Sequence, residues 1–449
     1  MHSIRRYIIF LFVLLTEVLP IEAETVACRP GQLHALVSAP AAVTDLVLTG
    51  SADASDFFFI GSEMPSLRRL DISGLTIAAY RGDKLGIASE WPAATIPSGA
   101  LAGSAIESVI LPTAPTAIGE TAFTSTALKS IVIPATITSV GENAFADSRN
   151  LTTATISVPR LGGYTFRGCT ALKEVSFTGP VALGRCDFAG CTALDVVNGS
   201  ENITIIGKSS FDGCQALKSF DFGKKLETLG ERAFAASGLE SVIIPSTASL
   251  AAIGPWAFAD CKSLAEVSLP ESVATVGRGA FFGVSRLASM TLPGGVEALD
   301  DYAMVDMKEL QTIDASALRA VPALGDDVFE GIDQPATTLK TDPQMADEFL
   351  NAAQWQEFKI DGMSMLVDLT GMRGVPVVRG RINGGILEIE AQGTTLSLVE
   401  VYDLSGQLLT ALRPGSDTVC ADLSGISSPV LIVRCTTAED MRVSLKLAR

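Results

Sequence analysis

Histidine is nearly absent from this sequence, and its scarcity limits the chemistry that the chain can perform. Only His2 and His34 occur among 449 residues. A histidine cluster on a metal ion is therefore excluded, and a serine–histidine–aspartate triad would depend on one of these two. No glycine-rich loop with a lysine is present to cradle phosphate. We expect no catalytic, cofactor-binding or metal-binding residue and no cofactor, and we predict that the chain is not an enzyme.

Basic and aromatic residues are also scarce. Lys and Arg number 33 against 50 Asp and Glu, so the net charge is −17, and aromatic residues make up 6% of the chain. A surface with this excess of negative charge is a poor partner for nucleic acid or anionic membranes. Few rings are free to stack on sugars, because most belong to the repeat described below. We therefore expect a protein partner, and glycan capture is the alternative.

Long apolar runs are confined to the N-terminus. Arg5 and Arg6 precede the apolar run 8–15, and a plausible cleavage site follows at Ala23. This order is typical of a secretory signal, and we interpret residues 1–23 as one. The rival interpretation, a membrane anchor, needs about 20 apolar residues, more than this run has. The residues before Cys28 resemble a lipoprotein box, so lipidation of Cys28 stays open.

One sequence motif recurs throughout residues 91–335. Each copy has an apolar residue five positions before a slot that is usually phenylalanine, and glycine directly follows that apolar residue in nine of eleven copies. Successive slots are 21 to 25 residues apart. The slot residues are Leu101, Phe123, Phe145, Phe166, Phe188, Phe211, Phe234, Phe258, Phe281, Met304 and Phe329. A period in this range indicates a stacked-repeat solenoid.

Two further positions are fixed within each copy. Glycine, as in Gly119 and Gly207, suggests a backbone angle that a side chain would forbid. A leucine after the slot opens a run Leu-x-x-apolar-x-apolar, such as Leu128–Ile133, which alternates like a strand. Stacking would bury the phenylalanines as an internal spine beside a parallel sheet. At about 4.8 Å between neighbouring strands, eleven copies would form a rod or arc of roughly 50 Å.

One residue of each strand run is the candidate for contact with a partner. It lies between the last two apolar positions and should point outward. Down the array this row is small, polar to mildly apolar, and free of aromatics: Val132, Thr155, Ser176, Asn198, Asp221, Ile243, Ser268, Thr291 and Asp314. The row predicts a face that binds protein, and simple solvation of the same residues is the alternative.

Cysteine occurs eight times in a chain whose expected compartment is oxidising. Four cysteines lie three residues after the phenylalanine of their copy: Cys169, Cys191, Cys214 and Cys261. Because this is a repeat position and not a metal spacing, we interpret them as small buried thiols. Cys186 has no obvious partner. Cys420 and Cys435 fall in strands that we expect to be adjacent, so a disulfide between them stays open.

Two pairs of neighbouring carboxylates are candidate ligands for calcium. Asp300 and Asp301 form one pair, and Asp326 and Asp327 form the other. Calcium prefers such oxygens, but no calcium-loop spacing surrounds either pair. We interpret both as solvated turns.

The array is flanked by segments of different character. Residues 24–90 carry the strand pattern once, at 67–72, and are expected to form an N-terminal cap with a divergent first repeat. Residues 336–362 should add a strand at 338–340, a helix starting near Pro343, and Trp355 over the open end. Residues 363–449 alternate around glycine turns, which predicts a small antiparallel β-sandwich. The fold class is therefore a mainly-β or α/β solenoid with parallel strands, followed by this sandwich.

The repeat phrase resembles a known family. The segments ITSVGENAFADSRNLTTATI from Ile137 and ITIIGKSSFDGCQALKSFDF from Ile203 are similar to the BspA-like leucine-rich repeats of bacterial surface proteins. The resemblance implies a secreted or surface-exposed protein that binds other macromolecules, such as an adhesin for host or neighbouring-cell proteins. A passive structural or glycan-capturing component of the cell envelope is the alternative.

The C-terminal segment resembles the sorting domain of the type IX secretion pathway. The matching pieces are Val401–Gln407, Leu423–Arg434 and the terminal strand with Lys446. Residues 428–430 depart from the family, which usually has glycine and an aromatic there. The resemblance implies contact with the secretion machinery and a place outside a Gram-negative cell of the Bacteroidota. Whether the domain is later removed stays open.

Overall fold

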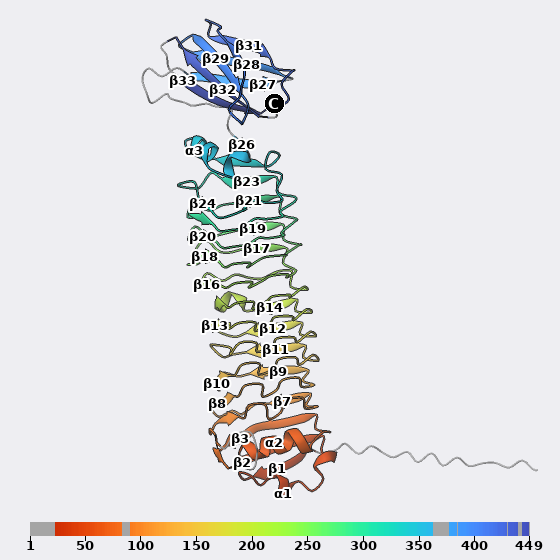
Figure 1. Ribbon diagram of the computed structural model, residues 1–449. Coiled ribbons are helices and arrows are strands. Elements are labelled where there is room, and N and C mark those ends of the chain that lie inside the picture. The colour runs from red at the N-terminus through yellow and green to blue at the C-terminus, as the bar shows by residue number, and fades with distance from the viewer. Residues whose placement is uncertain are drawn as a thin grey trace, which may run out of the picture.

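A computed structural model of the protein describes residues 23–82, 90–361, 377–383, 385–428, 430–438 and 442–448. The secretory signal expected at residues 1–23 lies outside the described residues, apart from its last position. Figure 1 shows strands stacked along one axis, with an N-terminal cap at one end and a small sandwich at the other. The stack has about 14 turns of parallel strands. The predicted solenoid with a C-terminal antiparallel unit is confirmed.

The turns contribute strands to two columns that follow the rod (Figure 1). The first column contains β7 (Ser108–Ile110), β9 (Ser130–Ile133), β11 (Thr153–Ile156), β12 (Glu174–Phe177), β14 (Val196–Asn198), β17 (Ser241–Ile243), β19 (Glu266–Ser268), β21 (Ser289–Thr291) and β23 (Thr312–Ala315). The second contains β6 (Thr95–Ile96), β8 (Thr116–Ile118), β10 (Ile137–Val140), β13 (Val181–Ala182), β15 (Ile203–Ile206), β16 (Thr228–Leu229), β18 (Ala252–Ile253), β20 (Thr275–Val276), β22 (Ala298–Leu299) and β24 (Ala323–Leu324). A short 3-10 helix, η2 (Ser200–Asn202), joins β14 to β15. Paired strands within each column are parallel, and equivalent repeat positions lie side by side, as Val132 does with Thr155.

Phenylalanine rings stack into a continuous spine inside the rod. The rings of Phe123 and Phe145 lie 5.2 Å apart between centroids at an interplanar angle of 3°. Phe188 and Phe211 lie 5.3 Å apart at 9°, and the stack continues without interruption to Phe281. All slot phenylalanines are buried. The predicted spine is confirmed, because side chains of one shape at equal intervals pack ring against ring.

The recurring glycine is explained by close packing between turns. None of the nine glycines has a positive φ, so the expected forbidden backbone angle is wrong. A Cβ built on Gly207 would lie 2.4 Å from the carbonyl oxygen of Gly184, one turn earlier. At Gly162 it would lie 2.2 Å from the carbonyl oxygen of Val140. Glycine is therefore required because successive backbones approach too closely for a methyl group.

Left-handed backbone occurs two residues after that glycine. Thr121, Tyr164 and Trp256 have φ values of 54°, 52° and 56°. The N–H of each donates to a carbonyl of the next turn, as from Trp256 to Arg278 at 2.7 Å. These bonds between turns offset a conformational cost of about 1–2 kcal/mol for a side chain in this region. We call the recurring glycine and the next two residues of each turn the glycine edge.

The four repeat cysteines are buried and free, as predicted. Each thiol donates to the backbone carbonyl of the phenylalanine one turn before its own, as Cys169 does to Phe145 (3.3 Å) and Cys261 to Phe234 (3.1 Å). Ser148 makes the same contact from the same repeat position. Burial raises the pKa of Cys169 to about 12 and that of Cys261 to about 11. These thiols therefore stay protonated, and their role is to satisfy buried carbonyls.

The N-terminal cap begins the stack with longer strands and a helix. It comprises β1 (Glu24–Cys28), α1 (Leu33–Leu36), η1 (Pro40–Ala42), β2 (Asp45–Ala52), α2 (Ala54–Glu63), β3 (Arg69–Ile77), β4 (Tyr80–Arg81) and β5 (Glu90–Trp91). β1, β2 and β3 pair in parallel, and β3 pairs with β7. Cys28 ends β1 with 4% of its side chain exposed. In this fold its side chain belongs to the core of the cap, and lipidation of Cys28 stays a prediction.

The other end of the rod is closed by aromatic side chains. The segment contains β25 (Thr338–Thr341), α3 (Ala346–Asn351), η3 (Trp355–Glu357) and β26 (Lys359–Asp361). α3 begins three residues after Pro343, close to the expected helix start, and β26 pairs in parallel with β25 to extend the sheet. Trp355 is fully buried, with its ring 4.8 Å from Phe329 and 5.3 Å from Phe349. This packing caps the phenylalanine spine.

The C-terminal unit is built from two antiparallel sheets. One has the order β27 (Val377–Asn383), β28 (Ile386–Gln392) and β31 (Thr418–Asp422), and the other β30 (Leu408–Leu412), β29 (Leu396–Tyr402), β32 (Val430–Thr437) and β33 (Arg442–Ala448). Cys420 is exposed on β31, whereas Cys435 is buried on β32 in the other sheet. The expectation that they lie in adjacent strands is wrong, and no disulfide joins them. The two strands lie in different sheets because β31 pairs with β28, and β32 with β29 and β33.

Candidate functional site

The outward side of the first column of strands is the candidate binding surface, which we call the strand face. Alternate side chains of each strand point to it, and none of the nine residues predicted from the sequence is buried. Val132 is 58% exposed and Ile243 is 52% exposed. The neighbouring inward residues, such as Ile131 and Val242, are buried in the core. The predicted outward row is confirmed.

The strand face exposes more apolar side chains than the sequence analysis identified. Among the described residues, eight large hydrophobic side chains are exposed, and half of them lie on this face: Ile110, Val132, Val196 and Ile243. Ile110 was missed because Ile106 replaces the leucine that opens other strand runs. Val196 was missed because it belongs to the second outward row of the strands. Exposed branched side chains gathered on one surface favour a role in binding.

Polar groups on the same face are held in fixed positions. The side-chain amide of Asn198 donates to Glu174 Oε1 at 2.8 Å and to Ser176 Oγ at 3.2 Å. These three residues come from neighbouring strands, β12 and β14, which pair in parallel register. The strand face can therefore offer an approaching protein both apolar contacts and preordered hydrogen-bonding groups.

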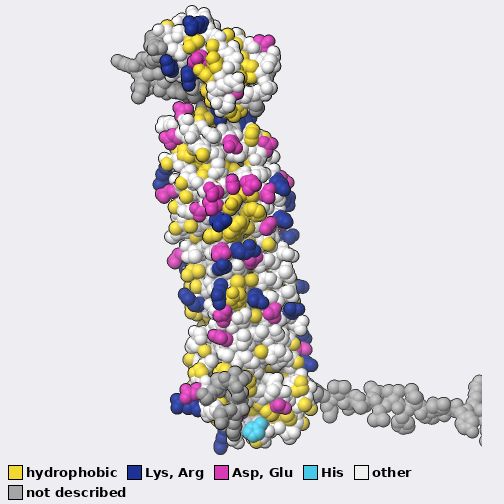
Figure 2. Space-filling model, in the orientation of Figure 1, with side chains coloured by type: hydrophobic (Ala, Val, Ile, Leu, Met, Phe, Trp, Pro, Cys, Tyr) yellow, Lys and Arg dark blue, Asp and Glu magenta, His cyan; other side chains and the backbone are white. Residues whose placement is uncertain are grey.

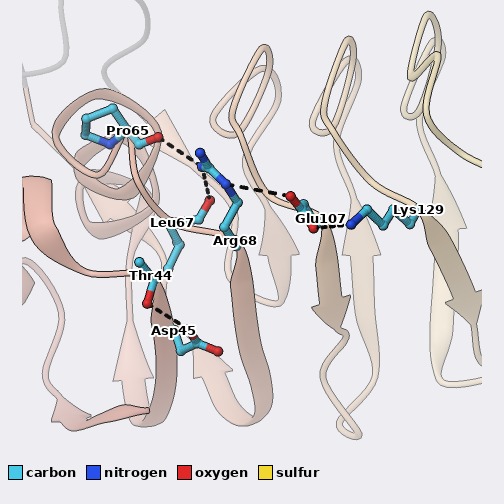
Figure 3. Close-up of polar contacts among 7 residues, drawn as sticks. All are labelled: Thr44, Asp45, Pro65, Leu67, Arg68, Glu107 and Lys129. Atoms are coloured by element: carbon cyan, nitrogen blue, oxygen red, sulfur yellow. Dashed lines mark hydrogen bonds and ion pairs between the residues drawn. The ribbon is translucent and has the colours of Figure 1, made fainter. Parts of the chain in front are cut away.

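A row of charged residues borders the strand face where each turn enters its strand. Figure 3 shows its first members, Arg68, Glu107 and Lys129, which reach toward one another from successive turns. Arg68 Nε lies 3.7 Å from Glu107 Oε1, and Lys129 Nζ donates to the other carboxylate oxygen. The hydrogen bond from Lys129 lowers the pKa of Glu107. Such exposed ion pairs contribute little to the free energy of unfolding. Because positive and negative residues alternate among these three, they do not form a patch of a single charge.

Asp187 is the most deeply buried acid of the array. It replaces the alanine found before the slot residue in many turns, and no part of it is exposed. Its carboxylate accepts the backbone N–H of Gly184 at 2.6 Å and that of Thr165 at 3.1 Å. Burial nevertheless raises the pKa of Asp187 to about 6, because removal from water disfavours the charge more than these donors favour it.

We expect Asp187 to make the free energy of unfolding depend on pH. A carboxyl with a raised native pKa adds most stability below its unfolded pKa near 3.8, and loses it as pH rises through about 6. Two pKa units correspond to about 3 kcal/mol. Urea denaturation of wild type and Asp187→Asn at pH 4 and pH 7 should show the variant relatively more stable at pH 7. A difference that is constant with pH would contradict the assignment.

The residues considered for chemistry are not brought together. His34 is exposed on α1, and its ring makes an edge contact with that of Phe59, at 6.5 Å between centroids. Asp301 accepts the backbone N–H of Asp326 at 3.0 Å, so these acids lie on successive turns of the glycine edge. In the part of the chain that the structure describes, no group of histidine, cysteine, aspartate and glutamate is suited to hold a metal ion. No helix of that part is long and apolar enough to cross a bilayer.

The hollows of the rod surface are shallow. One of about 780 Å³ lies over the early turns and is lined by polar residues that include Ser104, Thr126, Asp147 and Arg167. Small-molecule sites are usually enclosed and mostly apolar, and this hollow is neither. The strand face is therefore the surface whose geometry best suits a large partner.

Comparison with known proteins agrees with this repeat architecture. Residues 94–182 and 181–311 match the family described as BspA type leucine rich repeat region. A leucine-rich repeat protein from Bacteroides ovatus is 20% identical, with 73% of this chain and 85% of that chain covered and a TM-score of 0.41. The pneumococcal vaccine antigen PcpA is 16% identical over 66% of this chain and 69% of its own, with a TM-score of 0.31. A leucine rich repeat protein of T. pallidum is 24% identical, with 44% of this chain and 73% of that chain covered and a TM-score of 0.27. No curated protein matches the chain.

Proposed function

We propose that this protein, whose residues 94–311 carry BspA-type leucine-rich repeats, is a secreted or cell-surface protein that binds other proteins through its strand face. The observation that carries the proposal is the set of exposed apolar side chains, Ile110, Val132, Val196 and Ile243, on a face that is otherwise polar. Parallel strands hold these side chains on one side of the rod, on β7, β9, β14 and β17. An adhesive role toward host or neighbouring-cell proteins follows from the expected export of the chain.

The binding test uses the full mature chain and immobilised extracellular-matrix proteins, namely collagen, fibronectin, laminin and fibrinogen. The variant Ile110→Asp/Val132→Asp places charge on neighbouring strands of the face. Because apolar anchors supply much of the energy of protein interfaces, we expect the dissociation constant for a bound matrix protein to rise about tenfold or more. Surface plasmon resonance measures the change.

The matched control is Thr228→Asp/Ala252→Asp, which places the same charges on exposed residues of the second strand column. We expect this variant to bind as wild type does. Equal loss in both variants would assign the effect to net charge. Failure of the wild type to bind any protein, together with binding on a glycan array, would replace the proposal with glycan capture.

We also propose that the C-terminal sandwich directs export, on the strength of the sequence resemblance to a type IX sorting domain. The sandwich has its own buried core, which includes Leu387, Val399 and Val433. Deletion of residues 363–449 in the native cell should therefore remove the array from the cell surface while leaving it folded inside the cell. Antibody labelling of intact cells measures display, and unchanged labelling would refute the sorting role.

A further inference from the structure

Two aromatic residues of the glycine edge, Trp256 and Tyr302, and the nearby Phe282 are partly exposed outside the strand face. Trp256 occupies the left-handed position of its turn, and in the next turn that position is Gly279. A Cβ built on Gly279 would lie 2.3 Å from Cε3 of the Trp256 ring, so this ring lies directly against the glycine. The ring of Phe282 meets Trp256 in an edge contact, 5.5 Å between centroids. Because Gly279 has no side chain, the Trp256 ring can lie against the backbone of that turn.

A third ring approaches the same turn from the other side. Tyr302 has the left-handed position one turn beyond Gly279. The guanidinium of Arg278, the residue before Gly279, lies 5.3 Å from the centroid of the Tyr302 ring. Trp256, Phe282 and Tyr302 are all partly exposed. The contact with Arg278 shows that the Tyr302 ring accepts a guanidinium group.

Acidic residues lie on the following turns of the glycine edge. The N–H of Gly279 donates to the carbonyl of Asp301 at 2.9 Å, and that of Tyr302 to the carbonyl of Asp326 at 2.9 Å. Asp300 and Asp327 are the chain neighbours of Asp301 and Asp326. Among the described residues, no ion pair joins any of these four acids to a lysine or arginine. Figure 2 shows acidic and basic side chains interspersed with hydrophobic ones over this face of the rod.

We propose that Trp256, Phe282, Tyr302 and the neighbouring acids Asp326 and Asp327 form a second binding site, whose ligand is a lysine- and arginine-rich extended segment of a partner protein. Aromatic rings accept the alkyl stems and the cationic heads of lysine and arginine. The adjoining carboxylates accept the same heads by charge-assisted hydrogen bonds. The net charge of −17 attracts a basic segment from a distance.

The unpaired carboxylates favour a basic segment over a neutral glycan. Sugars also stack on tryptophan, but a neutral sugar would leave the negative charge of these acids uncompensated. A segment with repeated cations would compensate this charge and cover the rings at once. The site is separate from the strand face, because the glycine edge follows the second strand column in each turn.

The test measures binding of synthetic peptides to the full mature chain by isothermal titration calorimetry. The probes are an octapeptide of alternating lysine and arginine, a glutamate octapeptide and chitohexaose. We expect the basic peptide to bind with an affinity that falls as salt is raised, and the other two not to bind. The variant Trp256→Ala, and separately Asp326→Asn/Asp327→Asn, should each weaken binding of the basic peptide about tenfold. Unchanged thermal midpoints would show that both variants fold.

A charge-matched control separates a built site from attraction by the net charge alone. Asp195→Asn/Glu227→Gln also removes two exposed acids, but from positions away from the rings. We expect this control to weaken binding less than twofold. Equal weakening by both double variants, or an unchanged affinity in Trp256→Ala, would overturn the proposal. Binding of chitohexaose in place of the basic peptide would overturn it in favour of a glycan platform. None of these outcomes depends on binding at the strand face.

Discussion

Replacing Phe211 by alanine is expected to lower the free energy of unfolding by about 3–5 kcal/mol, the scale of such truncations in a packed core. Phe211 is fully buried in the middle of the spine, with its ring stacked between Phe188 and Phe234 at 5.3 and 5.1 Å. Phe220 makes a further T-shaped contact with this ring, at 5.2 Å between centroids. Truncation would leave a cavity bordered by rings that belong to three turns, and the rigid stack cannot collapse into it.

Urea denaturation followed by circular dichroism measures the Phe211→Ala effect. Because each turn touches only its neighbours, the loss could also divide unfolding into two transitions, one for each side of the substituted turn. Leu404→Ala is a suitable control, since Leu404 is 55% exposed on the C-terminal sandwich. We expect the control to change the free energy by less than about 0.5 kcal/mol. A midpoint for Phe211→Ala equal to wild type would contradict the spine.

The spine and the strand columns could be predicted because the same residue types recur in them at a fixed period. Each slot phenylalanine is weak evidence alone, but its recurrence in phase with a leucine and a strand run fixes which side chains meet. The outward row followed from the alternation of the same strands. The buried cysteines followed as well, although their bonds to phenylalanine carbonyls one turn away, such as Cys169 to Phe145, required the spacing between turns.

The reason for the recurring glycine could not be predicted, because it depends on the distance between turns. A left-handed backbone angle and a close approach of two backbones both favour glycine at a position. The sequence alone does not distinguish these two causes. The left-handed angle belongs instead to positions such as Tyr164 and Trp256, whose residue types vary from turn to turn. A position with no consensus gives no periodic signal, even where its backbone is unusual.

The aromatic site on the glycine edge was missed for a related reason. Trp256 and Tyr302 share one repeat position but are separated by Gly279, so no period links them. The Trp256 ring lies against the intervening turn because residue 279 has no side chain. The nine residues expected to point outward from the strands include no aromatic, and the remaining rings were expected mainly in the spine. Side chains that depart from a repeat are thus harder to place than those that define it.

Gly207→Ala is expected to lower the free energy of unfolding by about 3 kcal/mol, at the upper end of the range for overpacking. The added methyl group would lie 2.4 Å from the carbonyl oxygen of Gly184 and 2.6 Å from its carbonyl carbon. These are backbone atoms of the adjacent turn, so relief requires the two turns to separate. Separation would weaken the hydrogen bonds between turns and the contact of Phe188 with Phe211.

Gly213→Ala is the matched control, because it adds the same methyl group in the same turn. Its expected cost comes from the backbone angle and not from a close contact. Gly213 has a φ of +75°, but its added Cβ would meet nothing closer than 3.9 Å. We expect a loss of only about 1 kcal/mol, from the left-handed backbone alone. Chemical denaturation of both variants under one set of conditions compares the two costs. If Gly213→Ala were as destabilising as Gly207→Ala, the backbone angle and not the close approach of turns would govern the glycines of this fold.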